Sequence, residues 1–237
     1  MYCIFQGRMI TGGKEMNSKE ERITYKTEAT KEMVLTALFV AIIIAMAFIP
    51  YLGYIPLGFI NATTIHIPVI LGALFLGPKR GAFLGGVFGL TSMINNTMIN
   101  PSVTSFVFSP FYSLGQMHGN FASIIVCFVP RILIGVVAYY VFRLVSRLFK
   151  NVKGSNVVAF ACAGIAGSLT NTILVMSGIY FLFGESYASA KGMALDALYG
   201  FILTIIGTVG IPEAIVASVL VAAIGKVLSS VFKQKIS

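Results

Sequence analysis

The chain consists of long apolar stretches without charged residues, separated by short basic segments. No Asp, Glu, Lys or Arg occurs from Met33 to Pro78 or from Gly81 to Pro130. Each stretch is about twice the roughly 20 residues that a helix needs to cross the hydrocarbon core of a bilayer. Only helices and closed barrels satisfy their backbone groups in lipid, and these stretches lack the polar–apolar alternation of barrel strands. Each therefore predicts two membrane helices joined by a turn.

The whole pattern predicts an all-α membrane domain over residues 31–230, a bundle of six transmembrane helices. The first five expected spans cover about residues 31–49, 61–77, 80–98, 122–143 and 156–178, with outer loops at about 51–60 and 99–121. The composition agrees with this class. The chain is 57% hydrophobic and 11% charged, whereas soluble domains carry about 25% charged residues.

The sixth span allows two interpretations. Counting back from Lys226 starts it near Ile206, and Met193–Leu203 then forms a separate outer helix. Alternatively, one long helix starts near Ala194. We prefer the first interpretation because about 30 residues exceed the thickness of a bilayer.

The basic residues predict which side of the membrane is cytoplasmic. Of the 17 Lys and Arg residues, 15 flank the expected bundle or lie in the loops after its second and fourth spans. This positive-inside pattern predicts that both termini are cytoplasmic. It makes residues 1–30 a polar N-terminal segment with a tendency to disorder and residues 231–237 a short tail. Attraction to anionic lipid accounts for the net charge of +9, so we do not expect nucleic acid as a partner.

Five of the expected helices carry polar side chains at a similar depth. These residues are His66, Asn95 with Asn96, Arg131, Asn171 and Glu213. At 1.5 Å per residue they lie roughly 6–14 Å below the outer surface. A charge inside a bilayer costs a few kcal/mol and normally faces a partner or a cavity. Arg131 therefore indicates either a structural ion pair with Glu213 or a pocket for an anionic ligand, and the two can coexist.

Other patterns in the sequence give less information about function. Small residues recur at every fourth position in Ala37, Ala41 and Ala45 and again in Gly81, Gly85 and Gly89, which is typical of close helix packing. Known catalytic motifs are absent from the sequence, and neither a cofactor nor a metal site is expected. If uptake of a ligand is driven by ATP, another subunit must hydrolyse it.

The segment Ile55–Gly86 resembles the second and third helices of S components, the substrate-capturing subunits of energy-coupling-factor (ECF) vitamin transporters. The resemblance continues in Ser105–Pro110 and at Pro212–Ala214. It implies a bacterial plasma-membrane subunit that captures a water-soluble vitamin from outside. It also implies a transmembrane coupling (T) subunit, docked on the stripe Ala37, Ala41 and Ala45, and two ATP-binding subunits as partners.

Within the family, the chain most resembles the pantothenate type, through its Ile-Pro-Tyr-Leu-Gly first loop and the Ile-His-Ile-Pro that contains His66. The expected substrate-binding residues are Arg131, Asn171, Asn95, His66, Asn61, Glu213 and Gln116. Riboflavin, folate and other vitamins stay open as ligands. A stand-alone secondary transporter, coupled to an ion through Glu213, is the alternative from another class, and a membrane-embedded enzyme would need a nucleophile or metal set that the sequence lacks.

Overall fold

The computed structural model describes residues 18–49, 52–56, 61–150 and 154–231. The chain divides into two units, Met1–Val34 and Leu35–Ser237. Helix α1 (Ser18–Phe48) begins in the first unit and continues into the second. All the other described helices and strands belong to the second unit.

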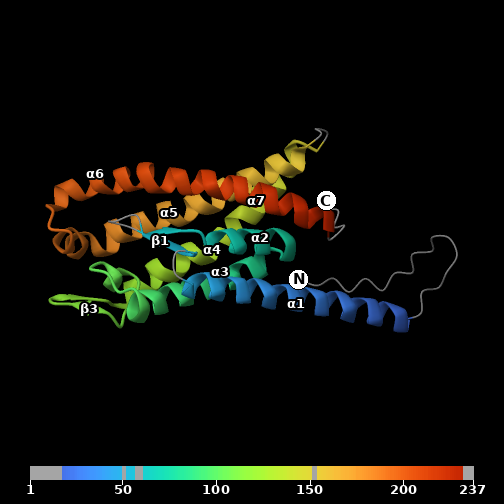
Figure 1. Ribbon diagram of the computed structural model, residues 1–237, viewed down its shortest axis with the longest axis horizontal. Helices are drawn as coiled ribbons and strands as arrows, with labels where there is room; N and C mark the ends of the chain where they lie inside the picture. The colour runs from blue at the N-terminus through green and yellow to red at the C-terminus, as the bar shows by residue number, and fades with distance from the viewer. Residues whose placement is uncertain (1–17, 50–51, 57–60, 151–153, 232–237) are drawn as a thin grey trace. The chain divides into compact units, whose positions relative to one another are not determined.

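The second unit is a bundle of helices (Figure 1). Its α-helices are α2 (His66–Leu76), α3 (Pro78–Ile94), α4 (Phe121–Leu148), α5 (Ser155–Ala190), α6 (Leu195–Ile205) and α7 (Ile211–Val231). Two π-helical turns, η1 (Asn95–Ile99) and η3 (Ile206–Gly210), and a 3₁₀ turn, η2 (Ser105–Val107), supplement them. Two antiparallel hairpins lie in the loops: β1 (Tyr54–Pro56) with β2 (Asn61–Thr63), and β3 (Ser113–Leu114) with β4 (Met117–His118).

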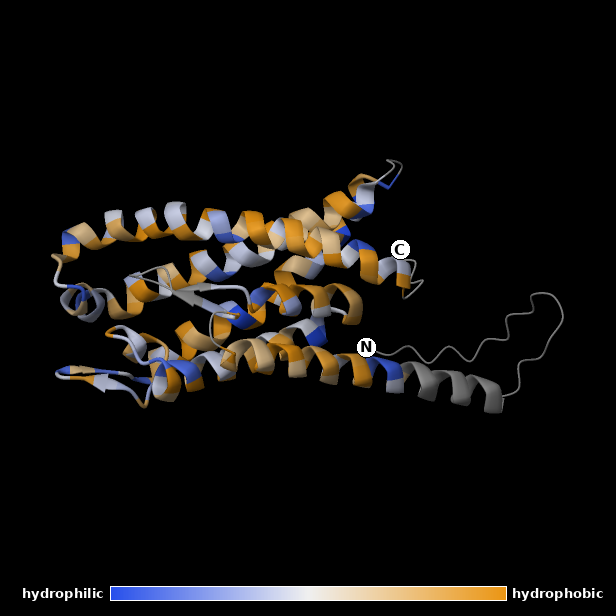
Figure 2. Ribbon diagram, viewed as in Figure 1, coloured by the Kyte–Doolittle hydropathy of each residue, from blue (hydrophilic) through white to orange (hydrophobic). Residues whose placement is uncertain are grey.

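The prediction of a helical membrane protein is confirmed. Within the described residues, five helical stretches are long and apolar enough to cross a membrane. They cover Ala29–Phe48, Pro78–Ile99, Phe121–Leu148, Ser155–Ala190 and Leu195–Val231. Figure 2 shows hydrophobic residues all along α7, where side chains such as Val219 and Val227 are more than half exposed. An apolar surface of this kind belongs against lipid.

The second expected span is shorter than the sequence predicts. A helix was expected from about residue 61, but Asn61–Thr63 pairs as a strand with Tyr54–Pro56, and α2 begins only at His66. Its 11 residues are roughly 16 Å long at 1.5 Å each, about half the hydrocarbon thickness. Pairing between the two strands and the bond from the Thr63 N–H to the Glu213 carboxylate satisfy backbone groups of this segment, so it can be extended within the membrane.

The preferred interpretation of the last span is wrong, and the alternative is correct. The helix runs without interruption from Leu195 to Val231 through the π-helical turn η3. In that turn the Ile211 N–H bonds to the Ile206 carbonyl, five residues earlier. Pro212, which lacks an N–H and would clash in a regular helix, lies two residues after this wider turn. The helix therefore accommodates its proline by widening and does not break.

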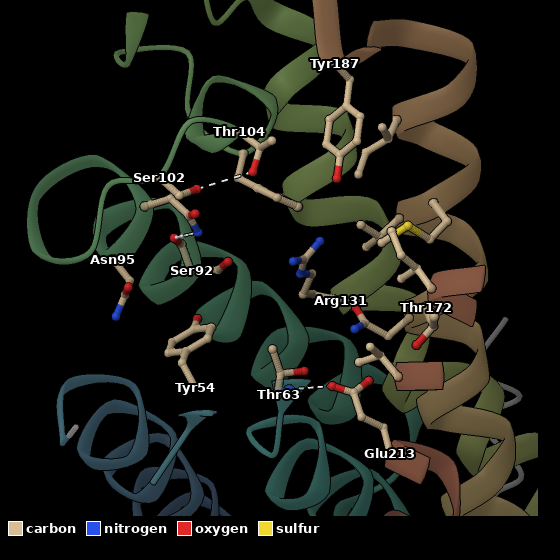
Figure 3. Close-up of a pocket in the computed structure, with 18 of the residues that line it drawn as sticks. Tyr54, Thr63, Ser92, Asn95, Ser102, Thr104, Arg131, Thr172, Tyr187 and Glu213 are labelled. Atoms are coloured by element: carbon tan, nitrogen blue, oxygen red, sulfur yellow. Dashed lines mark hydrogen bonds between the residues drawn. The ribbon is translucent and has the colours of Figure 1, made fainter. Parts of the chain in front are cut away.

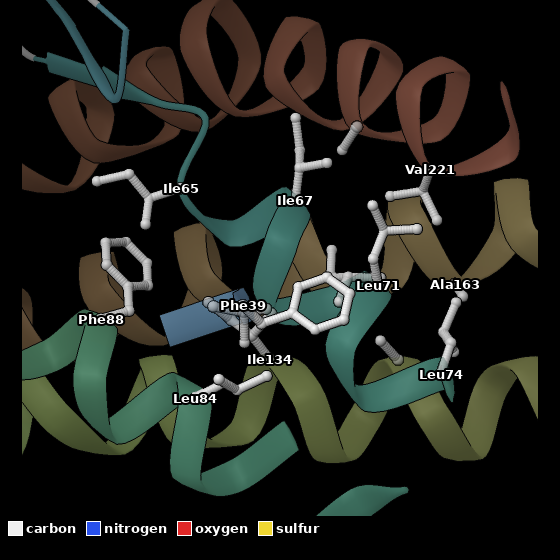
Figure 4. Close-up of a cluster of buried hydrophobic side chains, with 14 of the residues drawn as sticks. Phe39, Ile65, Ile67, Leu71, Leu74, Leu84, Phe88, Ile134, Ala163 and Val221 are labelled. Carbon is white, nitrogen blue, oxygen red and sulfur yellow. The ribbon is translucent and has the colours of Figure 1, made fainter. Parts of the chain in front are cut away.

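The short helix α2 lies in the middle of the apolar core (Figure 4). Nine of its eleven residues are buried. They pack with Phe39 and Ile43 of α1, Leu84 of α3, Ile134 of α4 and Val221 of α7, among others. Because α2 is apolar on all sides and short, the surrounding helices can enclose it completely.

The two small-residue stripes face different environments. Gly81, Gly85 and Gly89 are buried, and a side chain at Gly85 would meet the backbone carbonyl of Arg131 in α4. Ala37, Ala41 and Ala45 are exposed. The glycine stripe therefore brings α3 and α4 together, while the alanine stripe leaves a smooth, uncovered surface.

The contact at Gly85 leads to a prediction for stability. We expect Gly85→Ala to destabilise the protein by about 1–3 kcal/mol, because the new methyl group must displace the α4 backbone. Gly86→Ala is the matched control, since its Cβ would have no neighbour within 4 Å. Thermal unfolding of the purified protein in detergent measures both. Equal midpoints for the two variants would contradict the packing described.

Candidate ligand-binding site

A cavity of about 230 Å³ lies between α3, α4, α5 and the continuous α6–α7 helix (Figure 3). Its polar lining consists of Tyr54, Thr63, Ser92, Asn95, Asn96, Ser102, Thr104, Arg131, Asn171, Thr172, Tyr187, Lys191 and Glu213. Val175, Met176 and Ile179 form an apolar wall on the α5 side. A small cavity lined by converging polar groups is typical of a site for a small molecule.

Arg131 is a charged residue that lines this cavity. The adjacent Pro130 frees a backbone carbonyl to which its side chain donates a hydrogen bond. Pro130 lies inside α4 and has no N–H, so the Val126 carbonyl four residues earlier lacks its usual helical donor. Nη1 of Arg131 donates to that carbonyl at 2.8 Å. The side chain is 5% exposed. Nη1 of the guanidinium thus replaces the missing helical donor, and the other donors of the guanidinium can contact a ligand in the cavity.

Aromatic rings lie close to the guanidinium. Its central carbon is 5.6 Å from the ring centre of Phe88 and 5.2 Å from that of Phe108, within the range of a cation–π interaction. Among the described residues, no ion pair joins Arg131 to Glu213. The interpretation of Arg131 as half of a structural ion pair is therefore not supported.

Several polar atoms around the cavity are buried and have no hydrogen-bond partner within the described part of the chain. Five of them line the cavity: Nε of Arg131, Oδ1 of Asn171 and the hydroxyl oxygens of Tyr54, Thr63 and Ser92. A buried polar group without a partner costs about 1–3 kcal/mol. Such a concentration of donors and acceptors around one space suits a polar ligand.

The side chain of Asn95 makes hydrogen bonds within the protein that the sequence did not predict. It begins the π-helical turn η1 and lines the cavity, but its Nδ2 donates to the Ala47 carbonyl at 3.1 Å and its Oδ1 accepts from Asn100 at 3.3 Å. Its neighbour Asn96 donates to the Ser92 carbonyl at 2.9 Å. The side-chain amides of Asn95 and Asn96 therefore stabilise the end of α3, and Asn95 also links this end to α1.

Glu213 connects α7 to the first hairpin. Its carboxylate accepts a hydrogen bond from the backbone N–H of Thr63 in β2 (Figure 3). The carboxylate therefore holds the hairpin over the cavity, in addition to lining the cavity itself.

The structure does not bring all seven predicted residues together. Arg131, Asn171, Asn95 and Glu213 line the cavity, whereas His66 and Gln116 do not. His66 is buried at the start of α2, and Gln116 is exposed in the turn between β3 and β4. Asn61 begins β2, but its side chain lies outside the described residues.

Other lining residues were not predicted from the sequence. Tyr187 and Lys191 are four residues apart near the end of α5, a helix that was expected to end near residue 178 but continues to Ala190. Ser92 precedes Asn95 and Asn96 by about one helical turn, which was an available signal. Tyr54 reaches the cavity from a hairpin that the sequence did not predict. Partial burial lowers the pKa of the Lys191 ammonium.

A helical multi-pass membrane protein with a buried guanidinium in a polar cavity has the features of a membrane-embedded binding protein for a small molecule. Comparison with known proteins gives its family. The family model of the substrate-specific component of ECF transporters matches residues 31–225. The chain belongs to this family, and it is a multi-pass protein of the bacterial plasma membrane and a subunit of a transport system.

Two curated relatives are similar over most of their length. The pantothenic acid transporter PanT of Lactococcus lactis subsp. cremoris is 33% identical over 201 residues, which cover 84% of this chain and 94% of the relative. The pantothenate transporter PanT of Leuconostoc mesenteroides subsp. mesenteroides is 33% identical over 205 residues, which cover 84% of this chain and 92% of the relative.

The bond from Glu213 to the hairpin can be tested on stability. We expect Glu213→Leu to destabilise the protein by about 1–3 kcal/mol, because the Thr63 N–H would be left without an acceptor. Glu213→Gln retains an acceptor oxygen and should cost less. Glu185→Leu is the control, because it removes an exposed carboxylate. If thermal unfolding in detergent shows no difference between the Leu variants at 213 and 185, Glu213 does not support the hairpin.

Proposed function

We propose that this chain binds pantothenate from the outer side of the membrane, as the substrate-capturing subunit of an ECF transporter. The observation that carries the proposal is the buried Arg131 guanidinium, which faces the cavity without a carboxylate partner among the described residues. An anionic ligand would supply the missing charge. A charge-assisted hydrogen bond to a carboxylate is about twice as strong as a neutral one.

The remaining polar groups of the cavity suit the rest of this ligand. Pantothenate carries one carboxylate, one amide and two hydroxyls around a compact branched carbon chain. Asn171 would bind the amide, and the hydroxyls of Tyr54, Thr63 and Ser92 would exchange hydrogen bonds with those of the ligand. The apolar wall on the α5 side would contact the branched carbons.

The other candidate functions have less support. Both curated relatives are named for pantothenate and neither for riboflavin or folate, and a cavity of about 230 Å³ favours a compact molecule over a fused ring system. An ion-coupled secondary transporter would need Glu213 free to exchange ions, whereas its carboxylate binds the hairpin backbone. Membership of the ECF family also favours a subunit that depends on partners.

In this proposal a T subunit docks on α1, and two ATP-binding subunits supply the energy. The stripe of Ala37, Ala41 and Ala45 is exposed, while Phe39 and Ile43 on the same helix are buried in the core. Small side chains allow another helix to approach closely in a membrane. The stripe lies on the outside of the unit, so a partner can bind it without displacing the core.

The role of Arg131 can be tested by calorimetry with pantothenate. We expect Arg131→Ala to weaken binding by about 2–5 kcal/mol, as for other buried charge pairs. Arg131→Lys should also lose affinity, by about tenfold or more, because an ammonium cannot make the forked contact of a guanidinium with a carboxylate.

Arg147→Lys is the control, since it makes the same exchange outside the cavity. Riboflavin and folate should produce no binding heat. If a folded Arg131→Ala variant binds pantothenate as tightly as the wild type, Arg131 is structural. If the wild type binds riboflavin or folate and not pantothenate, the assigned ligand is wrong.

The proposed docking of a T subunit on the alanine stripe of α1 leads to a separate prediction. Ala41→Trp should reduce the amount of T subunit that co-purifies with the chain, because the large ring keeps the two helices apart. Binding of pantothenate by the isolated chain should not change. Ile42→Trp, at a neighbouring exposed position outside the stripe, should leave assembly intact. An equal loss of T subunit for both variants would show that the stripe has no special role.

A further inference from the structure

A second cavity, of about 580 Å³, lies where α4 ends and α5 begins, next to the end of α2. Its residues from Tyr139 to Lys150 belong to the last turns of α4 and the turn after it, whereas the ligand cavity involves Arg131. Arg147 is sixteen residues beyond Arg131, roughly 24 Å along the helix. The proposed capture of pantothenate makes no use of this space.

Positive charge dominates this second cavity. Arg143, Arg147 and Lys150 line it. The two arginines are four residues apart, which puts them on one face of α4, and the lysine follows just after the helix ends.

Acidic residues are scarce in this part of the chain. From residue 35 onward the sequence has only three of them, Glu185, Asp196 and Glu213. None of these three carboxylates lines the second cavity. The basic side chains there thus have no carboxylate from the described bundle beside them in the cavity wall.

Neutral donors add to this charge. The hydroxyl of Ser146 is buried and has no hydrogen-bond partner within the described part of the chain. Helix α5 begins beside the cavity, and its N-cap, Gly154, provides no side-chain cap. The backbone N–H groups of Ser155 and Asn156 therefore lack helical acceptors. Such N–H groups at the start of a helix favour an anion.

One of the cations is already held in position. Nη1 of Arg143 donates to the Tyr139 hydroxyl at 3.0 Å, and its guanidinium carbon lies 5.8 Å from the centre of the same ring. A guanidinium has five donors in a fixed fork, so most of them remain for a ligand. The planar fork matches the oxygens of a phosphate group.

The inner wall of the cavity is apolar. Leu74, Phe75 and Phe142 line it, and the two phenylalanines pack against Phe160 with ring centres 6.1 and 4.9 Å away. On the outside of the same end of α4, Leu148 is 71% exposed. Cations and apolar groups thus lie side by side, which suits a ligand with a charged head and an apolar body.

We propose that this cavity binds the phosphate headgroup of an anionic phospholipid from the cytoplasmic leaflet. Arg143, Arg147 and Lys150 contact the phosphate oxygens, Ser146 donates to one of them, and the acyl chains lie against the exposed apolar surface of α4. The basic loops predict that this end of the bundle is cytoplasmic, where anionic lipids attract basic residues. Inorganic phosphate offers the same oxygens but nothing for the apolar groups to contact.

Native mass spectrometry of the purified chain tests the proposal, with phosphatidylglycerol and phosphatidylcholine as the probes. The wild type should retain phosphatidylglycerol in preference to phosphatidylcholine. Arg143→Gln combined with Arg147→Gln should weaken retention of phosphatidylglycerol by about tenfold or more. Lys79→Gln combined with Lys226→Gln is the control, because it removes two positive charges that do not line the cavity.

Three outcomes would overturn the proposal. They are equal retention by the double arginine variant and the wild type, equal loss in the lysine control, and displacement of the lipid by inorganic phosphate or glycerol phosphate. Ser146→Ala, a smaller change, should weaken retention in the same direction and serves if the double variant does not fold. Pantothenate binding by all these variants should be unchanged, so failure of this proposal is distinguishable from failure of the proposed function.

Discussion

The ligand cavity depends on one interaction, the hydrogen bond from the Arg131 side chain to the Val126 carbonyl. A guanidinium inside a membrane helix is costly unless its donors are satisfied, and a proline inside a helix leaves a carbonyl without a donor. Here each defect compensates the other, because Pro130 frees the carbonyl that Nη1 of Arg131 takes at 2.8 Å. The arginine is thereby held at 5% exposure without a direct ion pair among the described residues, and it lines the cavity together with Glu213.

Irregular helix geometry builds the walls around that charge. The π-helical turns η1 and η3 both adjoin the cavity, the first with Asn95 and Asn96 and the second with Val209. A π-helical turn inserts one extra residue per turn and redirects the side chains that follow it. Asn95 then reaches back to the Ala47 carbonyl, and Glu213 reaches the hairpin. Polar side chains satisfy the backbone at these points, as the membrane requires.

The sequence was sufficient for the class of fold and for several residues that line the cavity, but it also put His66 at their depth, which the structure leaves outside the cavity. Charge-free stretches predict membrane helices, and depth counting brings Arg131, Asn171, Asn95 and Glu213 to one level, where the structure also places them around one cavity. The same counting assumes regular helices of bilayer length. It therefore missed the hairpin that carries Tyr54 and Thr63, and it missed Tyr187 because α5 continues past the expected end. The hydrophobic pattern and the lengths of the apolar stretches do not reveal where a polar side chain, such as that of Glu213, bonds to the backbone of an extended segment.

The cavity and the hairpin above it are energetically connected. Glu213 holds the Thr63 N–H, and the Thr63 hydroxyl is one of the buried groups without a partner in the described residues. A ligand that satisfied this hydroxyl would add a second attachment between the hairpin and the helices. Binding would then favour the conformation in which the hairpin lies over the cavity, by as much free energy as the ligand gains from that contact. In the proposed function, Thr63 would thus connect the ligand to the hairpin through its hydroxyl and the hairpin to α7 through its N–H.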